Sequence, residues 1–319
     1  MRRHLVILHL YGRNQADWAD FVELRGQYRR VAECARVDLI VPRGTADSPH
    51  EGTIQIHEVA GSYRDPLTFA ISALRKIREI HRKSPIDVVW AQDPFVCGIT
   101  GCLASRWYGF PFVAEICNDF FDLEALGAGP IERGSKSAVA AWVARRASRV
   151  RAVSCGIRDQ LVRRGVAPSK ISVLCCPTDM RLFDPASHAR NRRADSSMLV
   201  MFVGALVDRK GVDLLLLAAA TLRTEFPSLH IAIVGDGPSR EQLERLAATL
   251  GLEGVVKFWG RMPQEKLPNA LALADAVVLP SRNEGLPRCL VEALAMQRPV
   301  VATRISGNIE VVQDGETAA

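Results

Sequence analysis

Short apolar runs alternate with longer amphipathic stretches along the whole chain. This pattern is typical of parallel strands that helices bury on both faces. It predicts strands at 5–10, 37–41, 53–59, 87–91, 112–116, 149–154 and 170–175 in the first half, and at 198–204, 229–235, 255–260, 276–280 and 299–303 in the second.

A polar segment with few apolar residues, DPASHARNRRADSS at 184–197, separates the two sets of strands. The length of 319 residues also exceeds one ordinary core and fits two domains of about 150 residues each. We therefore expect an α/β protein with two Rossmann-like, doubly wound domains, 1–187 and 188–319. Such sheets bind ligands beyond the carboxyl ends of their strands, so the chemistry is expected in the loops that follow the strands.

The composition is that of a globular protein, with 48% apolar and 24% charged residues, and it excludes extensive disorder. Apolar windows such as 214–222 are shorter than the roughly 20 residues that a membrane span needs. The eight cysteines form no C-x-x-C pair and no His/Cys cluster with zinc spacing. We therefore expect reduced, mostly buried thiols in a cytoplasmic protein, and no metal site.

Two strand-to-helix turns of the second half offer candidate chemistry. In FVGALVDRKGVDLLLLAA (202–219) a strand ends at Gly204 and a helix begins near Lys210, which indicates either a phosphate site or a surface lysine. In IVGDGPSREQLERLA (233–247) Arg240 stands where a dinucleotide fingerprint needs its third glycine. This second turn is read as a close-approach turn, in which Ser239 or Asp236 can cap the helix.

A third turn, PSRNEGLPRCLVEALAMQRPVVAT, carries two glutamates eight positions apart. Pro287 suits the first position of a helix, which places Glu284 in the preceding loop and Glu292 in the second helical turn. Both carboxylates can reach one ligand of nucleotide-sugar size. A capping glutamate and a solvated one are the alternative reading.

With these three turns in this order, the second half resembles the donor domain of the family 4 retaining glycosyltransferases, the glycosyl transferases of group 1. The resemblance rests on VGALVDRKGVDLLL, IVGDGP, VKFWGRMP, ADAVVLPSRNEGLPRCLVEALAMQRPVVAT with its E-x7-E signature, and GNIEVV. It continues more faintly in DVVWAQDPFVCG, ASRVRAVSCGIRDQLVRRGV and KISVLCCPTDMRLF, and covers most of residues 85–319. It implies the GT-B fold, in which two such domains face each other across a cleft.

The resemblance assigns roles to individual positions. Glu284 would bind hydroxyls of the donor sugar, Glu292 the ribose hydroxyls, and Lys210 the diphosphate. The N–H groups of Gly285 and Leu286 would lie near the sugar or its phosphate, and the turn 260–262 would receive the base. The implied donor-binding residues are Gly204, Arg209, Lys210, Gly235, Asp236, Gly260, Arg261, Met262, Glu284, Gly285, Leu286 and Glu292, and the catalytic candidates are Glu284, Lys210 and Asp119.

The implied reaction needs no metal ion and no cofactor. Breaking the anomeric C–O bond of a UDP- or GDP-sugar leaves negative charge on a diphosphate, which a lysine and helix-start amides can stabilise. The chain contains no D-x-D triplet, which disfavours the metal-dependent GT-A class. In the family, retention is attributed to front-face attack, with the leaving phosphate helping to deprotonate the acceptor.

The sequence departs from the family pattern at four places. Ala205 replaces an arginine, so half of the diphosphate clamp is absent unless Arg209 substitutes. Cys117 and Asn118 replace a loop histidine, which leaves Asp119 as the polar candidate there. The glycine-rich first loop is reduced to Gly12. The chain also stops where related chains continue into a helix that returns to the first domain, so a fragment with an incomplete second domain, reduced stability and weak turnover is expected.

The acceptor would be read by the first half, which holds the basic surplus. Residues 1–195 contain 29 lysines and arginines against 21 acidic residues, a net charge of +8, whereas residues 196–319 have a net charge of −2. The helix expected at 69–83, apolar at Ile71, Leu74, Ile77 and Ile80, suits docking on an anionic membrane, or else packs on its own sheet with a solvated basic face. A lipid-linked or surface polysaccharide is the expected acceptor, and no nucleic acid is expected as a partner.

Two other functions stay open. A nucleotide-sugar 2-epimerase shares the architecture and would need no acceptor, although the E-x7-E signature favours a transferase. A sugar-nucleotide-binding protein that has lost turnover is suggested by Ala205, Cys117 and the short C-terminus.

Overall fold

The computed structural model describes residues 3–10, 28, 31–44, 50–51, 53–62, 64–121, 129–175, 178–188 and 197–315. These residues form two compact units, the first ending at residue 175 and the second beginning at 178. Phe183 is buried in the core of the second unit and thereby joins residues 178–188 to that unit. The domain boundary expected at 187/188 stays a prediction.

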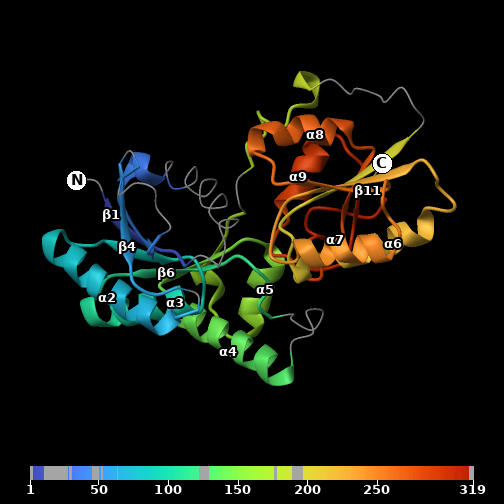
Figure 1. Cartoon of the computed structure of the whole chain (residues 1–319). Helices are drawn as coiled ribbons and strands as arrows, with labels where there is room; N and C mark the ends of the chain where they lie inside the picture. Colours follow the sequence, from blue (N-terminus) through green and yellow to red (C-terminus); the bar gives the residue numbers. More distant parts are fainter. Residues whose placement is uncertain are drawn as a thin grey trace. The chain divides into compact units, whose positions relative to one another are not determined.

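The first unit is built on a sheet whose described strands follow the order β3-β4-β2-β1-β5-β6-β7-β8. All neighbouring strands are parallel except β3 and β4. Helices α2, α3 and α4 cover one face of this sheet (Figure 1). The elements are β1 (Arg3–Leu8), β2 (Ala35–Pro42), β3 (His50–Glu51), β4 (Ile54–Val59), α2 (Pro66–Lys83), β5 (Val88–Ala91), α3 (Val96–Tyr108), β6 (Phe112–Ile116), α4 (Pro130–Arg146), β7 (Arg149–Ala152), α5 (Cys155–Arg163), η2 (Pro168–Lys170) and β8 (Ile171–Val173).

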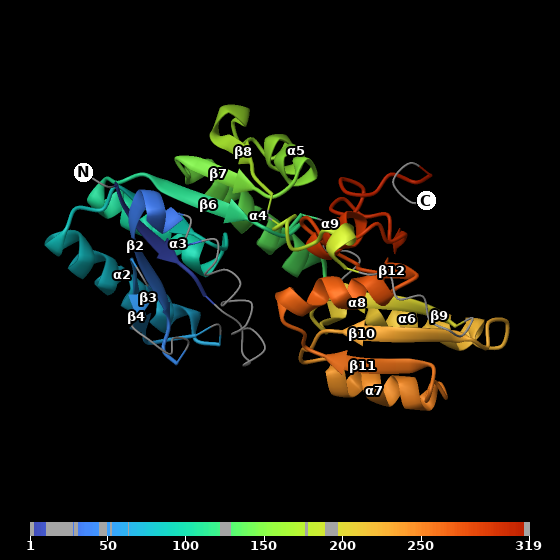
Figure 2. The ribbon, with the colours of Figure 1, turned by 90° about the horizontal axis from the view of Figure 1, so that it is seen from above.

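The second unit has a parallel sheet in the described order β11-β10-β9-β12-β13. Helices α8 and α9 lie on one face, and α6 and α7 on the other (Figure 1); strands β10 and β11 run side by side (Figure 2). The elements are η3 (Pro185–Ser187), β9 (Met198–Val203), η4 (Asp208–Lys210), α6 (Val212–Leu222), β10 (Leu229–Val234), α7 (Arg240–Thr249), β11 (Val256–Gly260), η5 (Gln264–Lys266), α8 (Leu267–Leu273), β12 (Ala276–Leu279), α9 (Arg288–Ala295) and β13 (Val300–Ala302).

Each strand that the apolar runs predict is present, which confirms the two doubly wound sheets. Some strands end earlier than predicted, because a buried residue need not pair with a neighbouring strand. The strand expected at 149–154 stops at Ala152, although Val153 and Ser154 are also buried. Strand β3 was not predicted, because its two residues, His50 and Glu51, form no apolar run.

The strand order places a topological switch point in each sheet. In the second sheet the chain starts at β9, runs outward to β11, and returns to the other side of β9 with β12. The connections after β9 and β12 therefore leave the sheet in opposite directions. In doubly wound sheets, ligands bind beyond the carboxyl ends of the strands at this point.

Helix α2 buries an apolar stripe made of Phe69, Ala73, Ile77 and Ile80. Asp65 caps its N-terminus by accepting a hydrogen bond from Thr68 N. Ile71, which the sequence suggested for membrane docking, is 47% exposed on another side of the helix. None of the helices that the structure describes is long and apolar enough to cross a membrane.

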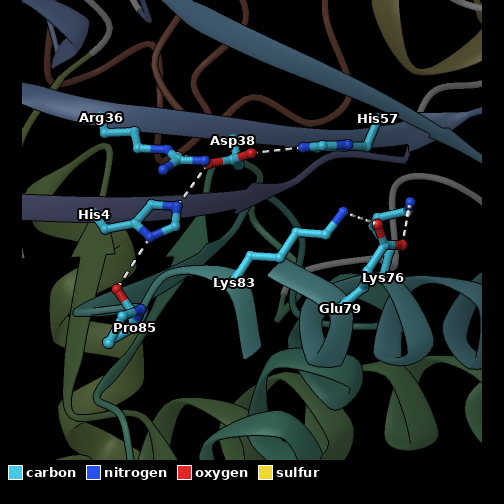
Figure 3. Close-up of polar contacts among 8 residues, drawn as sticks. All are labelled: His4, Arg36, Asp38, His57, Lys76, Glu79, Lys83 and Pro85. Atoms are coloured by element: carbon cyan, nitrogen blue, oxygen red, sulfur yellow. Dashed lines mark hydrogen bonds and ion pairs between the residues drawn. The ribbon is translucent and has the colours of Figure 1, made fainter. Parts of the chain in front are cut away.

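A buried carboxylate ties three strands of the first sheet together (Figure 3). Asp38 on β2 accepts hydrogen bonds at 2.6 Å from Nε2 of His4 on β1 and at 2.6 Å from Nε2 of His57 on β4, and it contacts Arg36 at 3.2 Å. Burial alone would raise the pKa of Asp38, but these hydrogen bonds and the charges of His57 and Arg36 outweigh burial and lower it. His4 Nδ1 lies 3.1 Å from the Pro85 carbonyl oxygen, so both ring nitrogens of this buried side chain have polar partners.

Loss of this carboxylate should destabilise the first unit far more than loss of an exposed one. Asp38→Ala leaves the buried His4 and the half-buried His57 without the carboxylate that both bind, so we expect the free energy of unfolding in urea to fall by about 2–4 kcal/mol. The control is Glu79→Ala, because Glu79 also contacts two cations, Lys76 and Lys83, but on the surface of α2 (Figure 3). Its expected cost is below about 1 kcal/mol.

The pH dependence of this difference follows from the lowered pKa of Asp38. A carboxylate whose pKa is lower in the folded state stabilises the fold at pH values above its unfolded-state pKa of about 3.9. This stabilisation is lost as the pH falls from that value toward the folded-state pKa. The gap between the wild type and Asp38→Ala should therefore be full at pH 6 and shrink below about pH 4. A gap that stays constant down to pH 2 would contradict the charge-based account.

Candidate functional site

The loops that follow β9 and β12 meet at the switch point of the second sheet. Gly211 joins η4 to α6 with φ +65°, and an added Cβ would lie 2.0 Å from the Pro280 carbonyl oxygen. Only glycine allows the η4 turn to sit this close to the end of β12. Arg282 N also donates to the Arg209 carbonyl oxygen at 2.8 Å. These contacts bring the predicted phosphate lysine and the first glutamate together.

Lys210 and Glu284 form an ion pair, 2.6 Å between Nζ and Oε1, with side chains only 12% and 6% exposed. The Ser281 hydroxyl donates to the same carboxylate oxygen at 2.7 Å. Arg209 Nη1 lies 3.7 Å from Oε2 of Glu284. The Glu284 carboxylate therefore faces two cations, Lys210 and Arg209, from the turn that follows β9. Arg209 is the cation that the resemblance would need in place of the arginine missing at Ala205.

Glu292 is 4% exposed and lies in the second turn of α9. Burial raises the pKa of the Cys289 thiol, in the first turn of the helix, to about 12; Lys210 lowers this pKa, and Glu284 and Glu292 raise it. These four side chains are therefore electrostatic neighbours. Their burial excludes the alternative of one capping and one solvated glutamate.

The start of α9 differs by one residue from the prediction. Pro287 has extended backbone angles and occupies the N-cap, so the helix begins at Arg288. Gly285 is buried and Leu286 is half-buried in the loop before it.

Glycines bring the ends of three neighbouring strands close together: Gly235 after β10 contacts Gly204 after β9 and Gly260 at the end of β11. Gly235 has φ +139°, and an added Cβ would lie 1.8 Å from the Gly204 carbonyl oxygen. Gly235 N donates to the Gly260 carbonyl oxygen at 2.8 Å, so these glycines lie at three adjacent strand ends. The prediction of a close-approach turn is confirmed. Of the other predicted base contacts, Arg261 is exposed and Met262 is half-buried against the core.

The predicted side-chain cap of α7 is wrong. Ser239 already has helical backbone angles, and its hydroxyl donates to Asp208 Oδ1 at 2.8 Å. Asp236 instead accepts from Gly237 N at 2.8 Å and from Arg240 at 3.0 Å. Asp236 and Arg240 therefore hold the loop beside Gly260, because an added Cβ on Gly260 would come within 3.3 Å of the Arg240 guanidinium.

The remaining catalytic candidate, Asp119, belongs to the first unit. It is 1% exposed, accepts from Phe121 N at 3.0 Å and accepts from Gln160 Nε2 at 2.8 Å. These bonds organise the loop after β6, and the catalytic role of Asp119 stays a prediction. Gly12, the remnant of the glycine-rich loop, lies outside the described residues.

The sequence did not reveal the residues after β13 that pack against the loop containing Glu284. An added Cβ on Gly307 would lie 2.6 Å from the Glu284 carbonyl oxygen, so the chain after β13 presses on this loop. Asn308 Nδ2 donates to the Thr303 carbonyl at 2.8 Å, and the Thr303 hydroxyl donates to the Ser281 carbonyl at 2.5 Å. The GNIEVV block carried this signal, a glycine followed by a buried amide, without indicating its target.

Among the residues that the structure describes, no group of three or more His, Cys, Asp or Glu side chains is arranged to hold a metal ion. The seven described cysteines carry thiols, and only Cys97 is fully buried. The expectation of mostly buried thiols is wrong for Cys34, Cys155 and Cys175, which are exposed because they lie at the ends of elements or in loops.

Comparison with known proteins decides the family. The model for group 1 glycosyl transferases matches residues 184–319, and the model for glycosyl transferase 4-like domains matches residues 22–177. The chain belongs to the group 1 glycosyl transferases. This confirms the resemblance.

Individual relatives agree with this family. The chain is 31% identical over 226 residues to alpha-D-kanosaminyltransferase of Streptomyces kanamyceticus (67% of this chain, 58% of that protein). It is 39% identical over 150 residues to the GDP-mannose-dependent alpha-(1-6)-phosphatidylinositol monomannoside mannosyltransferase of Mycolicibacterium smegmatis (44% and 39%). It thus spans less than two thirds of the length of these curated relatives.

A solved structure shows the same fold. HepE of Anabaena, in complex with UDP-glucose, superimposes with a TM-score of 0.74 at 22% identity, covering 98% of this chain and 83% of that one. The likeness confirms the predicted GT-B fold of this group 1 chain. The facing of its two domains across a cleft stays a prediction.

The ion pair at the switch point should be coupled strongly enough to measure. Lys210→Met or Glu284→Gln each leaves one charged partner buried, and each should lower the free energy of unfolding by about 3 kcal/mol. The double variant should lose clearly less than the two single losses together, because it leaves no such charge. Urea unfolding of the four proteins measures this.

The exposed pair Lys136–Glu132 on α4 is the matched control, with the same 2.6 Å separation. Its coupling should stay below about 1 kcal/mol. Additive losses at Lys210 and Glu284 would show that the two side chains do not depend on each other.

Proposed function

We propose that this protein is a retaining glycosyltransferase that moves a sugar from a UDP- or GDP-sugar to a glycan or lipid-linked acceptor, without a metal ion or cofactor. The observation that carries the proposal is the buried Lys210–Glu284 pair at the switch point of the second sheet. One basic and one acidic group at that point match the two halves of a nucleotide sugar, the diphosphate and the sugar hydroxyls.

Donor binding would exchange the partners of this pair. Lys210 would turn to the diphosphate, joined by Arg209 and the N–H groups at the start of α6. Glu284 would then accept hydrogen bonds from the sugar hydroxyls, and Glu292 from the ribose. Each carboxylate bond of this kind is charge-assisted and contributes about 1.5–3 kcal/mol.

The transfer step follows from where charge develops. The anomeric C–O bond breaks and its electron pair leaves with the diphosphate, while an acceptor hydroxyl oxygen bonds to the anomeric carbon from the same face. The acceptor proton passes to the leaving phosphate oxygen. Lys210 stabilises the negative charge of the leaving group, and a preorganised group of this kind contributes roughly a factor of 10² to 10³ in rate.

The named relatives support the choice of donors and acceptors. HepE was solved with UDP-glucose, and the mycobacterial relative is named for GDP-mannose and a phosphatidylinositol acceptor. We therefore include both nucleotides and propose a role in cell-surface polysaccharide or glycolipid synthesis, in the cytoplasm. Peripheral contact with an anionic membrane is part of the proposal, supported by Leu67 and Ile71, 71% and 47% exposed on a helix that also exposes Arg75, Arg78 and Arg82.

A substrate screen tests this function and separates the alternatives. Wild-type protein is incubated with UDP- and GDP-sugars, with and without lipid-linked acceptors, and nucleotide release and sugar products are measured. Transfer to an acceptor supports the proposal. An epimerised sugar without acceptor would identify a 2-epimerase, and saturable binding without release on any acceptor would identify a binding protein that has lost turnover.

Glu284→Gln should reduce kcat by about 10²-fold or more in this assay, because the neutral amide cannot supply the charge-assisted hydrogen bond to the sugar. Glu292→Gln should instead raise KM, since its predicted partner is the ribose. Glu241→Gln on α7 is the control, because Glu241 is exposed and pairs with Arg245 away from the predicted site residues; it should behave as wild type. Wild-type turnover by Glu284→Gln would overturn the assignment of Glu284.

A further inference from the structure

A second contact joins the same two loops without using Lys210 or Glu284. The Arg282 guanidinium binds Asp213 in a fork, with Nη1 2.8 Å from Oδ1 and Nη2 2.5 Å from Oδ2. Nη1 also donates to the Asp208 carbonyl oxygen at 2.8 Å. The Arg282 backbone N–H donates to the Arg209 carbonyl oxygen at 2.8 Å. One residue of the loop after β12 therefore makes four hydrogen bonds to residues 208–213, the segment formed by η4 and the start of α6.

These bonds fix the chain on both sides of Lys210, the predicted diphosphate-binding residue. Asp208 opens η4 and Asp213 lies in the first turn of α6, so Arg282 holds both ends of the six-residue segment at whose centre Lys210 stands. Glu284 follows Arg282 by two positions. Fixing Arg282 against this segment therefore fixes the backbone of both members of the Lys210–Glu284 pair.

We propose that Arg282, together with Asp213, is a positioning residue that keeps Lys210 and Glu284 in register while a nucleoside diphosphate sugar replaces their direct contact. This inference rests on the proposed function, because it assumes that the pair opens for a donor. The Arg282–Asp213 clamp involves neither ligand-facing group, so it persists when that pair separates. Without it, binding would also have to order two loops.

The chemistry of arginine suits this task. A planar fork with two parallel N–H···O bonds fixes orientation as well as distance, and a third donor remains for the Asp208 carbonyl. The position of Asp213 in the first turn of α6 adds the attraction of the helix N-terminus for a carboxylate. Lysine, a point charge, would retain the attraction to Asp213 but not the geometry.

The test compares ligand affinity across a mutant cycle. Arg282→Gln, Asp213→Asn, their double variant and Arg282→Lys are titrated calorimetrically with UDP and GDP, and with UMP and GMP. For the diphosphate that wild type binds, we expect each variant to weaken affinity about tenfold and the double variant no more than the singles. The corresponding monophosphate should lose less, because Lys210 acts on the diphosphate.

Arg245→Gln is the matched control, since Arg245 and Glu241 form an exposed pair at 2.5 Å on α7. It should bind all four nucleotides as wild type does. A lower melting temperature of Arg282→Gln with unchanged diphosphate affinity would show a structural role only and overturn the proposal. Equal losses for diphosphate and monophosphate would overturn it too.

Amide hydrogen exchange tests the clamp without any ligand. In Arg282→Gln, the amides of 208–213 and 281–284 should exchange at least tenfold faster than in wild type, while those of β9 and β12 keep their protection. If wild type binds neither UDP nor GDP, the proposed function fails, and exchange still decides whether the clamp orders the loops. Unchanged exchange in these segments would overturn the clamp itself.

Discussion

The second unit depends on the requirement that a charge removed from water be matched by an opposite charge. Glu284 is almost completely buried, and Lys210, Arg209 and the Ser281 hydroxyl supply the polar and charged partners that offset the cost of burying its carboxylate. Each of these partners comes from a loop at the carboxyl end of β9 or β12. The pairing of this one carboxylate thus links two loops whose residues Lys210 and Glu284 are 74 positions apart in the chain.

Close backbone approach provides the second constraint, because the loops must be near enough for these charges to meet. Gly211 against Pro280, Gly235 against Gly204 and Gly307 against Glu284 are contacts that no Cβ would permit. The glycines therefore set the spacing of the loops, and the charged side chains fill that spacing. Backbone contacts as well as side-chain packing therefore hold the polar residues at this edge of the second sheet in place.

Much of this architecture could be predicted from residues near one another in the sequence. The strands follow from their apolar runs, and the turns at Lys210 and Glu284 follow from glycines and prolines beside those runs. What could not be predicted are partners brought together by strand order: Arg282 with Asp213, 69 positions apart, and Asp38 with His4 and His57 on three neighbouring strands. A polar residue within an apolar strand signals that a partner exists, but only the register of the sheet identifies it. The Ser239 hydroxyl was misassigned for the same reason, since its acceptor lies in another loop.

The glycine contacts at the ends of β9, β10 and β11 also bear on how this enzyme family can diversify. At Gly235 an added Cβ would lie 1.8 Å from the Gly204 carbonyl oxygen, so a substitution there would force the two strand ends apart. Under the proposed function, donor choice would therefore vary through side chains near these glycines, such as exposed Arg261 and half-buried Met262 and Leu286. Libraries aimed at changing the transferred sugar or its nucleotide would be smaller and richer in folded members if they varied these three positions and left the glycines untouched.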